Sequence, residues 1–132
     1  MPRGLLWLSA VALMACPAPP VPDVGVACND DGTAVCDPTG TRMLQCTHSV
    51  WRLYSDCRGP DRCAHTGDTI SCDTSGNTVG DTCPPTSEGK VRCDPDGGVN
   101  FLRCIDGGLA IIDTCPTGTL CGFRPDAGLS CW

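Results

Sequence analysis

Residues 28–72 read CNDDGTAVCDPTGTRMLQCTHSVWRLYSDCRGPDRCAHTGDTISC, a stretch with six cysteines and few large apolar side chains. Residues 83–131 contain six more cysteines at nearly the same spacing. The successive separations are 8, 10, 11, 6 and 9 in the first stretch and 10, 11, 11, 6 and 10 in the second. Self-similarity at this level indicates a duplicated unit. The sequence therefore predicts two copies of one six-cysteine module.

The residues between the cysteines repeat as well. The motif Cys-Asp-Pro-x-Gly at 36–40 recurs at 93–97, and the Cys-x5-Cys motif at 57–63 recurs at 115–121. Asp-Pro-x-Gly is turn chemistry, because proline fixes one turn position and glycine relieves a later one. Each turn is expected to join two strands of a hairpin.

A further strand is predicted after each hairpin, at 50–54 in the first module and at 109–112 in the second, where β-branched and aromatic or aliphatic residues are bounded by turn formers. The Cys-x5-Cys loop and the last cysteine would then close a unit of three or four strands. The predicted fold class is a small disulfide-rich β protein with two tandem modules of short antiparallel strands and little helix.

Cysteine pairing must supply much of the stability. Cysteines make up 13 of the 132 residues, and small cores bury too little apolar surface to hold a fold alone. We expect all pairs to form within a module, although the spacing does not choose among the possible pairings. The twelve cysteines are Cys28, Cys36, Cys46, Cys57, Cys63, Cys72, Cys83, Cys93, Cys104, Cys115, Cys121 and Cys131.

The thirteenth cysteine has a different role. A short basic segment and an apolar stretch of ten residues at 5–14 lead into Leu13-Met14-Ala15-Cys16. Ten residues are too few to span a bilayer, which favours a secretion signal. The motif resembles the lipobox of bacterial lipoproteins, although Met14 is larger than the usual residue. The resemblance implies cleavage before Cys16, a diacylglycerol thioether on its sulfur and an acyl chain on its new amino group.

The domain organisation follows from these assignments. Four prolines between positions 17 and 22 predict a stiff tether of about 20 Å. Pro17 is not the aspartate that retains many such lipoproteins at the inner membrane, so we expect export to the outer membrane, on its periplasmic or surface face. The expected order is a signal peptide at 1–15, a lipidated proline-rich tether at 16–24, module 1 at 25–73, a hinge at 74–79 and module 2 at 80–132.

Catalytic and metal chemistry is not expected. There are no Cys-x2-Cys pairs for structural zinc, and the acidic turns at 29–32 and 94–97 lack the spacing of an EF-hand calcium loop. His48 and His65 have no counterparts in the second module and are expected to be exposed. The net charge of −6 argues against nucleic acid as a partner. We predict a protein that is not an enzyme and has no cofactor.

Both modules resemble the chitin-binding modules of carbohydrate-binding family 19. They share with that family the glycine-cysteine start, the turn, the Leu-x-Cys motif and the final Cys-x5-Cys. The resemblance implies that an exposed aromatic ring stacks on a sugar, and Trp51 with Tyr54 are the candidates. The second module has Leu109 where the tryptophan would stand. Trp51 is equally a candidate for the main core residue of module 1.

Two functions are consistent with these features of the sequence. The first is a structural or protein-interaction role in the cell envelope, with membrane lipid held through Cys16 and an envelope protein as the partner. The second is binding of a chitin-like or peptidoglycan-like polysaccharide through the aromatic residues of module 1.

The cysteine assignment predicts a simple result from intact mass measurement of the exported protein. The mass should include lipid on Cys16, and alkylation should add no label before reduction and twelve labels after it. Any alkylatable thiol in the unreduced protein would contradict the assignment.

Overall fold

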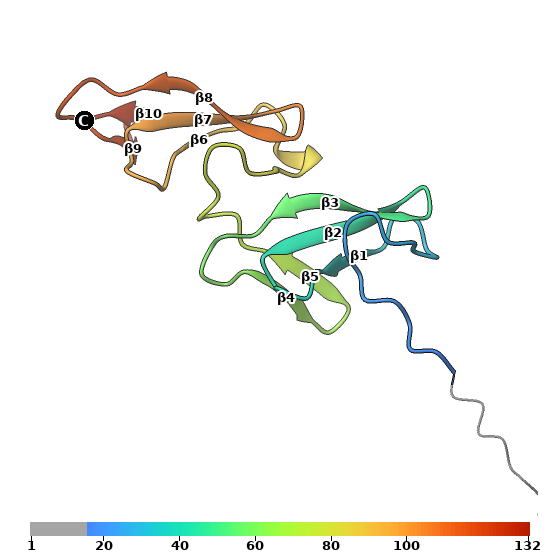
Figure 1. Ribbon diagram of the computed structural model, residues 1–132. Helices are drawn as coiled ribbons and strands as arrows, with labels where there is room; N and C mark the ends of the chain where they lie inside the picture. Colours follow the sequence, from blue (N-terminus) through green and yellow to red (C-terminus); the bar gives the residue numbers. More distant parts are fainter. Residues whose placement is uncertain (1–15) are drawn as a thin grey trace, which may run out of the picture.

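The computed structural model describes residues 16–132, so the signal peptide predicted at 1–15 lies outside the described residues. Module 1 contains five strands and module 2 repeats them (Figure 1). The strands of module 1 are β1 (Ala34–Cys36), β2 (Arg42–Thr47), β3 (Val50–Asp56), β4 (Cys63–Thr66) and β5 (Thr69–Cys72). Those of module 2 are β6 (Val91–Cys93), β7 (Asn100–Ile105), β8 (Gly108–Thr114), β9 (Cys121–Arg124) and β10 (Gly128–Cys131), and a 3-10 turn, η1 (Pro85–Ser87), precedes them. The predicted disulfide-rich β fold is confirmed.

Each module is built on a three-stranded antiparallel sheet, in the order β1-β2-β3 or β6-β7-β8. The Asp-Pro-x-Gly turn joins the first two strands as the sequence predicts, and a tight turn joins the second to the third. In both sheets the middle strand places a cysteine opposite the main apolar residue of the third strand, Cys46 opposite Trp51 and Cys104 opposite Leu109. Both sheets also contain a register shift at the same place, before Leu44 and before Leu102.

The end of each module differs from the expectation. The Cys-x5-Cys loop leads into a second, two-stranded sheet, β4-β5 or β9-β10, rather than closing a single sheet. Cys63 lies opposite Cys72 in the β4-β5 hairpin, and Cys121 lies opposite Cys131 in the β9-β10 hairpin. The two cysteines of each cross-strand pair are nevertheless not joined by a disulfide. Each of these cysteines instead forms a disulfide to the first part of its module, so the hairpin is fixed by its two covalent links.

The disulfides have the same connectivity in both modules: first to third, second to fifth and fourth to sixth. The expectation that all pairs form within a module is confirmed. The bonds are Cys28–Cys46, Cys36–Cys63, Cys57–Cys72, Cys83–Cys104, Cys93–Cys121 and Cys115–Cys131.

The apolar core of each module is very small. In module 1 it consists of Leu44, Trp51 and the Cys28–Cys46 disulfide, with Val26 and other half-buried side chains packed against it. In module 2 it consists of Leu102, Leu109 and the Cys83–Cys104 disulfide. So few apolar side chains leave most of the stability to the covalent links.

A buried carboxylate organises each Asp-Pro-x-Gly turn. The Asp37 side chain accepts hydrogen bonds from the backbone N–H groups of Thr41 and Arg42, from the Thr39 hydroxyl and from Nε of Arg42 at 2.9 Å. Burial raises the pKa of Asp37, but the bonds from Thr39 and Arg42 outweigh it and hold the pKa below its ordinary value. Asp94 stands at the same place in module 2 with other donors, the Asp96 N–H, the Asn100 side chain and the Thr78 hydroxyl.

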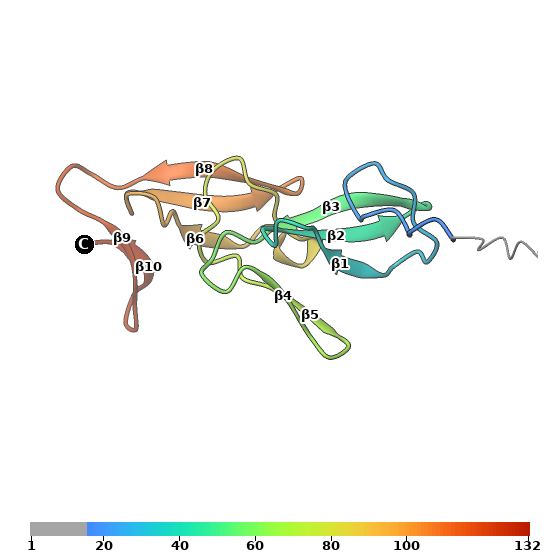
Figure 2. The same ribbon diagram turned by 60° about the horizontal axis from the view of Figure 1, so that its bottom comes forward.

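The two modules follow one another along an elongated molecule, with the tether at one end and the β9-β10 hairpin at the other (Figures 1 and 2). The segment 74–79, expected to act as a hinge, makes hydrogen bonds to both modules. The Asn77 side chain donates to the Asp56 carbonyl at 2.6 Å and accepts from the Arg58 N–H at 2.9 Å. The Thr78 hydroxyl donates to Asp94 of module 2 at 2.7 Å.

Replacing Asp37 with asparagine should lower the free energy of unfolding by about 1.5–3 kcal/mol, because the amide NH2 would face the donor Nε of Arg42 inside a closed turn. Urea unfolding of both proteins with the disulfides intact would measure this difference in the free energy of unfolding. Asp30→Asn is the matched control, since Asp30 is exposed.

The contribution of Asp37 should also depend on pH. Because its folded-state pKa is lowered, its stabilisation is complete above the ordinary carboxyl pKa and is lost as the pH falls through the lower folded-state value. The difference between wild type and Asp37→Asn should therefore shrink on acidification. A difference that stayed constant down to pH 2 would contradict this account.

Candidate functional site

Cys16 is exposed and is the one cysteine of the described residues that forms no disulfide. All thirteen cysteines lie within residues 16–132, so this position is the unpaired one by structure as well as by counting. Six disulfides place the protein in an oxidising or extracellular compartment. An exposed, unpaired cysteine at the head of a proline tether is available for a covalent attachment.

Trp51 lies in the core of module 1 and not on an open surface. The residue is 9% exposed and packs with Leu44 and the Cys28–Cys46 disulfide. A ring that stacks on a sugar must offer one open face, which this ring does not. Of the two roles open for Trp51, the structure supports the core role, because the largest apolar side chain of a module with so small a core is needed inside it.

Tyr54 does not join Trp51 in a shared surface. It is half-buried in a shallow groove of about 230 Å3, where residues of module 2 such as Thr82 and Pro85 form the other wall. The structure therefore places the two aromatic candidates in different surroundings, one in the core and one at the junction of the modules.

The acidic turn at 29–32 is used to fix a neighbouring turn. Asp31 accepts hydrogen bonds from the backbone N–H groups of His48 and Ser49, at 3.2 and 2.8 Å. Both of those residues have positive φ, 52° and 60°, a conformation that non-glycine residues rarely adopt. The Asp31 carboxylate thus stabilises the strained turn between β2 and β3.

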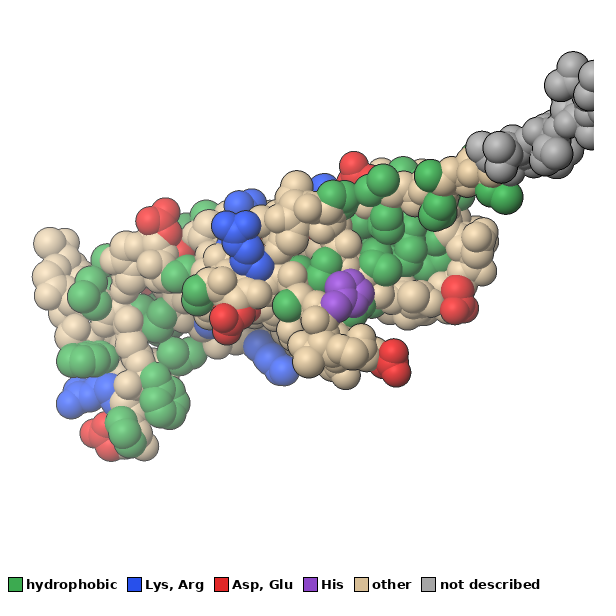
Figure 3. All heavy atoms as spheres, turned by 90° about the horizontal axis from the view of Figure 1, so that it is seen from below, with side chains coloured by type: hydrophobic (Ala, Val, Ile, Leu, Met, Phe, Trp, Pro, Cys, Tyr) green, Lys and Arg blue, Asp and Glu red, His purple; other side chains and the backbone are tan. Residues whose placement is uncertain are grey.

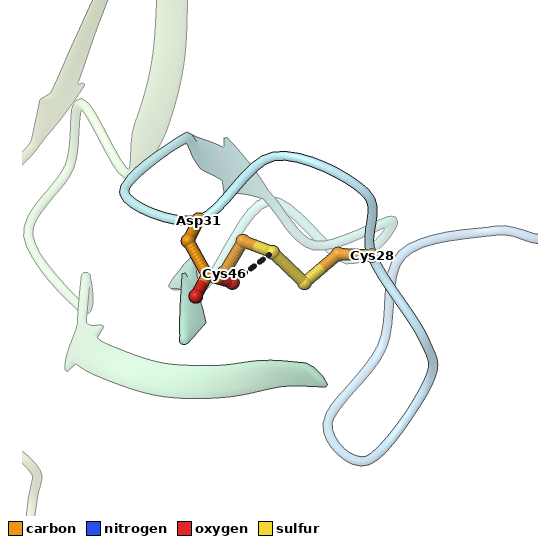
Figure 4. Close-up of side chains that lie close together, drawn as sticks. All are labelled: Cys28, Asp31 and Cys46. Atoms are coloured by element: carbon orange, nitrogen blue, oxygen red, sulfur yellow. Dashed lines mark hydrogen bonds between the residues drawn. A yellow bond between two sulfur atoms is a disulfide. The ribbon is translucent and has the colours of Figure 1, made fainter. Parts of the chain in front are cut away.

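Asp31 also lies beside the Cys28–Cys46 disulfide, as Figure 4 shows, with its Oδ1 3.5 Å from the Cys46 sulfur. These three residues are close enough together to hold a metal ion. Because the two sulfurs are bonded to each other, neither is a thiolate and neither has a proton to donate. The contact is therefore packing of a carboxylate on a disulfide, and the cluster does not form a metal site.

Module 2 contains the same device with a different residue. Glu88 accepts hydrogen bonds from Asp106 N–H at 2.9 Å and Gly107 N–H at 3.3 Å, and its Oε2 lies 3.6 Å from the Cys104 sulfur. A carboxylate on the disulfide thus supports the same turn in both copies. Sequence comparison missed this pair, because Asp31 and Glu88 lie at different distances from the preceding cysteine.

The other acidic turn and the two histidines also have structural surroundings. Asp94 is buried and accepts bonds from the Thr78 hydroxyl and the Asp96 N–H. His48 lies in the β2-β3 turn, whereas His65 lies on β4 with its Nε2 accepting from the Cys36 N–H at 3.5 Å. Both histidines are exposed, as predicted, and they lie on different elements.

A wider groove of about 610 Å3 lies where the linker meets module 2. Its arginine is already engaged, because Arg92 donates to the carbonyls of Thr74 and Ser75, at 2.6 Å each. Asp73 accepts from the N–H groups of Asp61 and Ser75. Arg92 and Asp73 therefore hold the linker in place, whereas Lys90 lines the groove without a side-chain partner among the described residues.

The most exposed large apolar side chains of the folded modules lie on and beside the β9-β10 hairpin, which sequence analysis did not single out. Phe123 is 71% exposed, Trp132 62% and Leu120 57%. Figure 3 shows hydrophobic side chains gathered on this projecting hairpin and beside the tether at the other end. The signal was present in the sequence, since Cys131 is followed by Trp132 where Cys72 is followed by Asp73.

The Trp132 ring is held in place although it is exposed. The Arg124 guanidinium lies over it, 5.6 Å from the ring centre, a cation–π contact. The ring also packs on Gly122, where a Cβ would come within 2.7 Å of the Trp132 Nε1. Module 1 has Ala64 at the position of Gly122, so the close approach is specific to module 2.

Because Trp51 is a core residue, Trp51→Ala should lower the free energy of unfolding of module 1 by about 3–5 kcal/mol. Trp51→Leu should cost clearly less, because module 2 folds with Leu109 at the same place. Urea unfolding of both variants would compare them. Equal and small losses would contradict the core role.

Comparison with protein-family models, with curated proteins and with solved structures finds no match for this chain. The described part of the chain, residues 16–132, contains no helix with the length and hydropathy of a membrane span.

Proposed function

We propose that this chain is an exported lipoprotein of the bacterial envelope, anchored by lipid at Cys16, and that it acts as a non-enzymatic protein-interaction module. The observation that carries the proposal is the placement of two features at opposite ends of the molecule. Cys16 heads the tether at one end, and the β9-β10 hairpin carries exposed Phe123 and Trp132 at the other (Figure 1). The anchor would hold the protein at the outer membrane while the hairpin faces a partner.

The make-up of the hairpin surface favours a protein partner. Soluble proteins rarely leave aromatic and aliphatic side chains together in water unless the patch binds something. Phe123 is paired across the hairpin with Leu129, and Leu120 lies beside Trp132 in the backbone ladder. Aromatic residues are enriched in the core of protein interfaces, and a ring fixed by Gly122 and Arg124 loses little conformational freedom on binding.

Carbohydrate binding is the alternative function, but it would use residues other than Trp51 and Tyr54. The buried position of Trp51 does not favour sugar stacking in module 1. In the described part of the chain, Phe123 and Trp132 are the most exposed rings, and Leu129 and Leu120 are their neighbours across the backbone ladder. The charged groups of the hairpin already contact the hairpin itself, since Arg124 lies over the Trp132 ring and 3.8 Å from Asp126. This composition ranks a protein partner first.

Site-specific photocrosslinking in the native cell tests the proposal. A photoreactive phenylalanine at position 123 should give an adduct with an envelope protein, whereas the same residue at position 65, the exposed counterpart on module 1, should not. The adduct should decrease in the Gly122→Ala variant, which displaces the Trp132 ring without a left-handed backbone strain.

Two results would overturn the proposal. One is equal crosslinking from positions 123 and 65, which would show random proximity. The other is retention of the mature protein on insoluble chitin or peptidoglycan that is lost in Trp132→Ala, which would establish the carbohydrate alternative.

A further inference from the structure

The contact between the two modules has a counterpart at each end of the molecule. Inside the chain, the end of β3 in module 1 meets the start of module 2. The Asp56 N–H donates to the Thr82 carbonyl at 3.0 Å, and the Thr82 N–H donates to the Asp56 carboxylate at 2.7 Å. Nε of Arg58 donates to the buried Asp81 carboxylate at 2.7 Å. We call the surface that contains Asp56 and Arg58 the carboxyl face of module 1. The surface that contains Asp81 and Thr82 is the amino face of module 2.

The repeat defines the equivalent surfaces that the chain leaves uncovered. The carboxyl face of module 2 contains Thr114 and Pro116 at the positions of Asp56 and Arg58. Ile111 and Ile112 of β8 stand at the positions of Leu53 and Tyr54, which line the junction groove in module 1. Ile111 is 46% exposed and Ile112 is 40% exposed, whereas Leu53 and Tyr54 are half-buried. Within residues 16–132 nothing covers this face.

The amino face of module 1 is uncovered in the same way. It contains Val26, which is half-buried against the core of module 1, and the exposed Ala27, at the positions of Asp81 and Thr82. Among the described residues, neither the N–H nor the carbonyl of Ala27 has a hydrogen-bond partner, although both groups of Thr82 are bonded to Asp56. An exposed pair of unsatisfied backbone groups is a site where another chain can pair.

The two uncovered faces lack the same pair of charges, although Asp113 stands at the position of Ser55, whose hydroxyl donates to the Thr82 carbonyl at 3.4 Å. The Arg58–Asp81 ion pair is replaced by Pro116 and Val26, so both charges are absent together. The bond from the Arg58 N–H to the Asn77 side chain has no equivalent either. Pro116 has no N–H, and the counterpart of Asn77 is a second proline, Pro22.

Such paired changes are not what solvent exposure produces. A surface that stays in water tends to be polar and charged, as a protein of this acidity can easily provide. Here Ile111, Ile112 and Pro116 are the apolar residues of one face, beside the polar Asp113 and Thr114, and Val26 and Ala27 are those of the other. The two faces correspond to the two sides of an existing interface, and each lacks the charge that its counterpart would need as a partner.

We propose that copies of this chain associate head to tail, with the carboxyl face of module 2 on one copy bound to the amino face of module 1 on the next. The inference goes beyond the proposed function, because the partner is a second copy and the two faces do not include the Phe123 and Trp132 surface of the β9-β10 hairpin. The contact is heterologous, because it joins two different faces, and it therefore builds rows or rings rather than a closed two-fold dimer.

The test uses the full chain with Cys16→Ser, exported to an oxidising compartment and purified, and follows the average mass by sedimentation velocity over a range of concentrations. This parent chain, in which both faces are unchanged, should have an average mass that rises with concentration and exceeds the mass of a dimer. Pro116→Arg and Val26→Asp should each keep the chain monomeric at concentrations where the parent associates, because each places an unpaired charge in the contact. Thr69→Arg, on exposed β5, is the matched control and should associate like the parent.

Mixing the two variants provides the decisive comparison. The new arginine of the Pro116→Arg chain and the new aspartate of the Val26→Asp chain would recreate the pair that Arg58 forms with Asp81. The other two faces of the mixed chains are unchanged, so the two variants should alternate and the mixture should grow beyond a dimer, although each variant alone is monomeric. Module 2 already accommodates aspartate at the position of Val26, and a thiol count with circular dichroism would check that each variant is folded.

Three outcomes would overturn self-association: a parent chain that stays monomeric, variants that associate like the parent, or a mixture that stays monomeric. If the parent is monomeric but position 123 still crosslinks to another envelope protein, the proposed function stands and only the second copy as partner is wrong.

Discussion

The disulfide between the first and third cysteine of each module is the constraint on which the rest of the structure depends. Cys46 and Cys104 are buried in the middle strands, opposite the main apolar residue of the next strand. Each disulfide ties the start of its module across this strand and supplies much of the core that so few apolar residues leave unfilled. A carboxylate, Asp31 or Glu88, packs on the same sulfur and supports the strained turn beside it. Core, chain entry and hairpin turn thus meet at one covalent bond.

Much of this fold could be predicted from the sequence, because its determinants are local or periodic. Cysteine spacing showed the duplication, and Asp-Pro-x-Gly located the first hairpin. The pairing could not be predicted, since it depends on which cysteines the strands bring together. The extra β4-β5 hairpin was missed because its short segment has no strong apolar alternation. For the candidate site, the sequence singled out Cys16, whereas Trp51 could not be assigned to core or surface until its burial was known. The hairpin surface was missed because exposure of Phe123 and Trp132 depends on how β9 and β10 project.

The module junction and the ends of the molecule contrast in chemistry. Inside the chain the modules meet through charges and hydrogen bonds, and the linker supplies several of them. A polar contact suits an intramolecular junction, because the covalent link already removes most of the entropic cost of bringing the partners together. At the two ends no such link exists, and the apolar Pro116 and Val26 take the positions of Arg58 and Asp81. This difference is what an interface between separate molecules requires, since association must then overcome the loss of translational and rotational freedom.

The confinement of every disulfide to one module has a consequence for biogenesis. The last bond of module 1 closes at Cys72, before any cysteine of module 2 begins at Cys83. A chain that crosses the membrane from its amino end can therefore oxidise and fold the first module while the second is still in transit. The number of wrong partners available to each thiol stays small, and the finished first module presents the carboxyl face on which the second can settle. Duplication in tandem thus divides a twelve-cysteine folding problem into two successive six-cysteine ones.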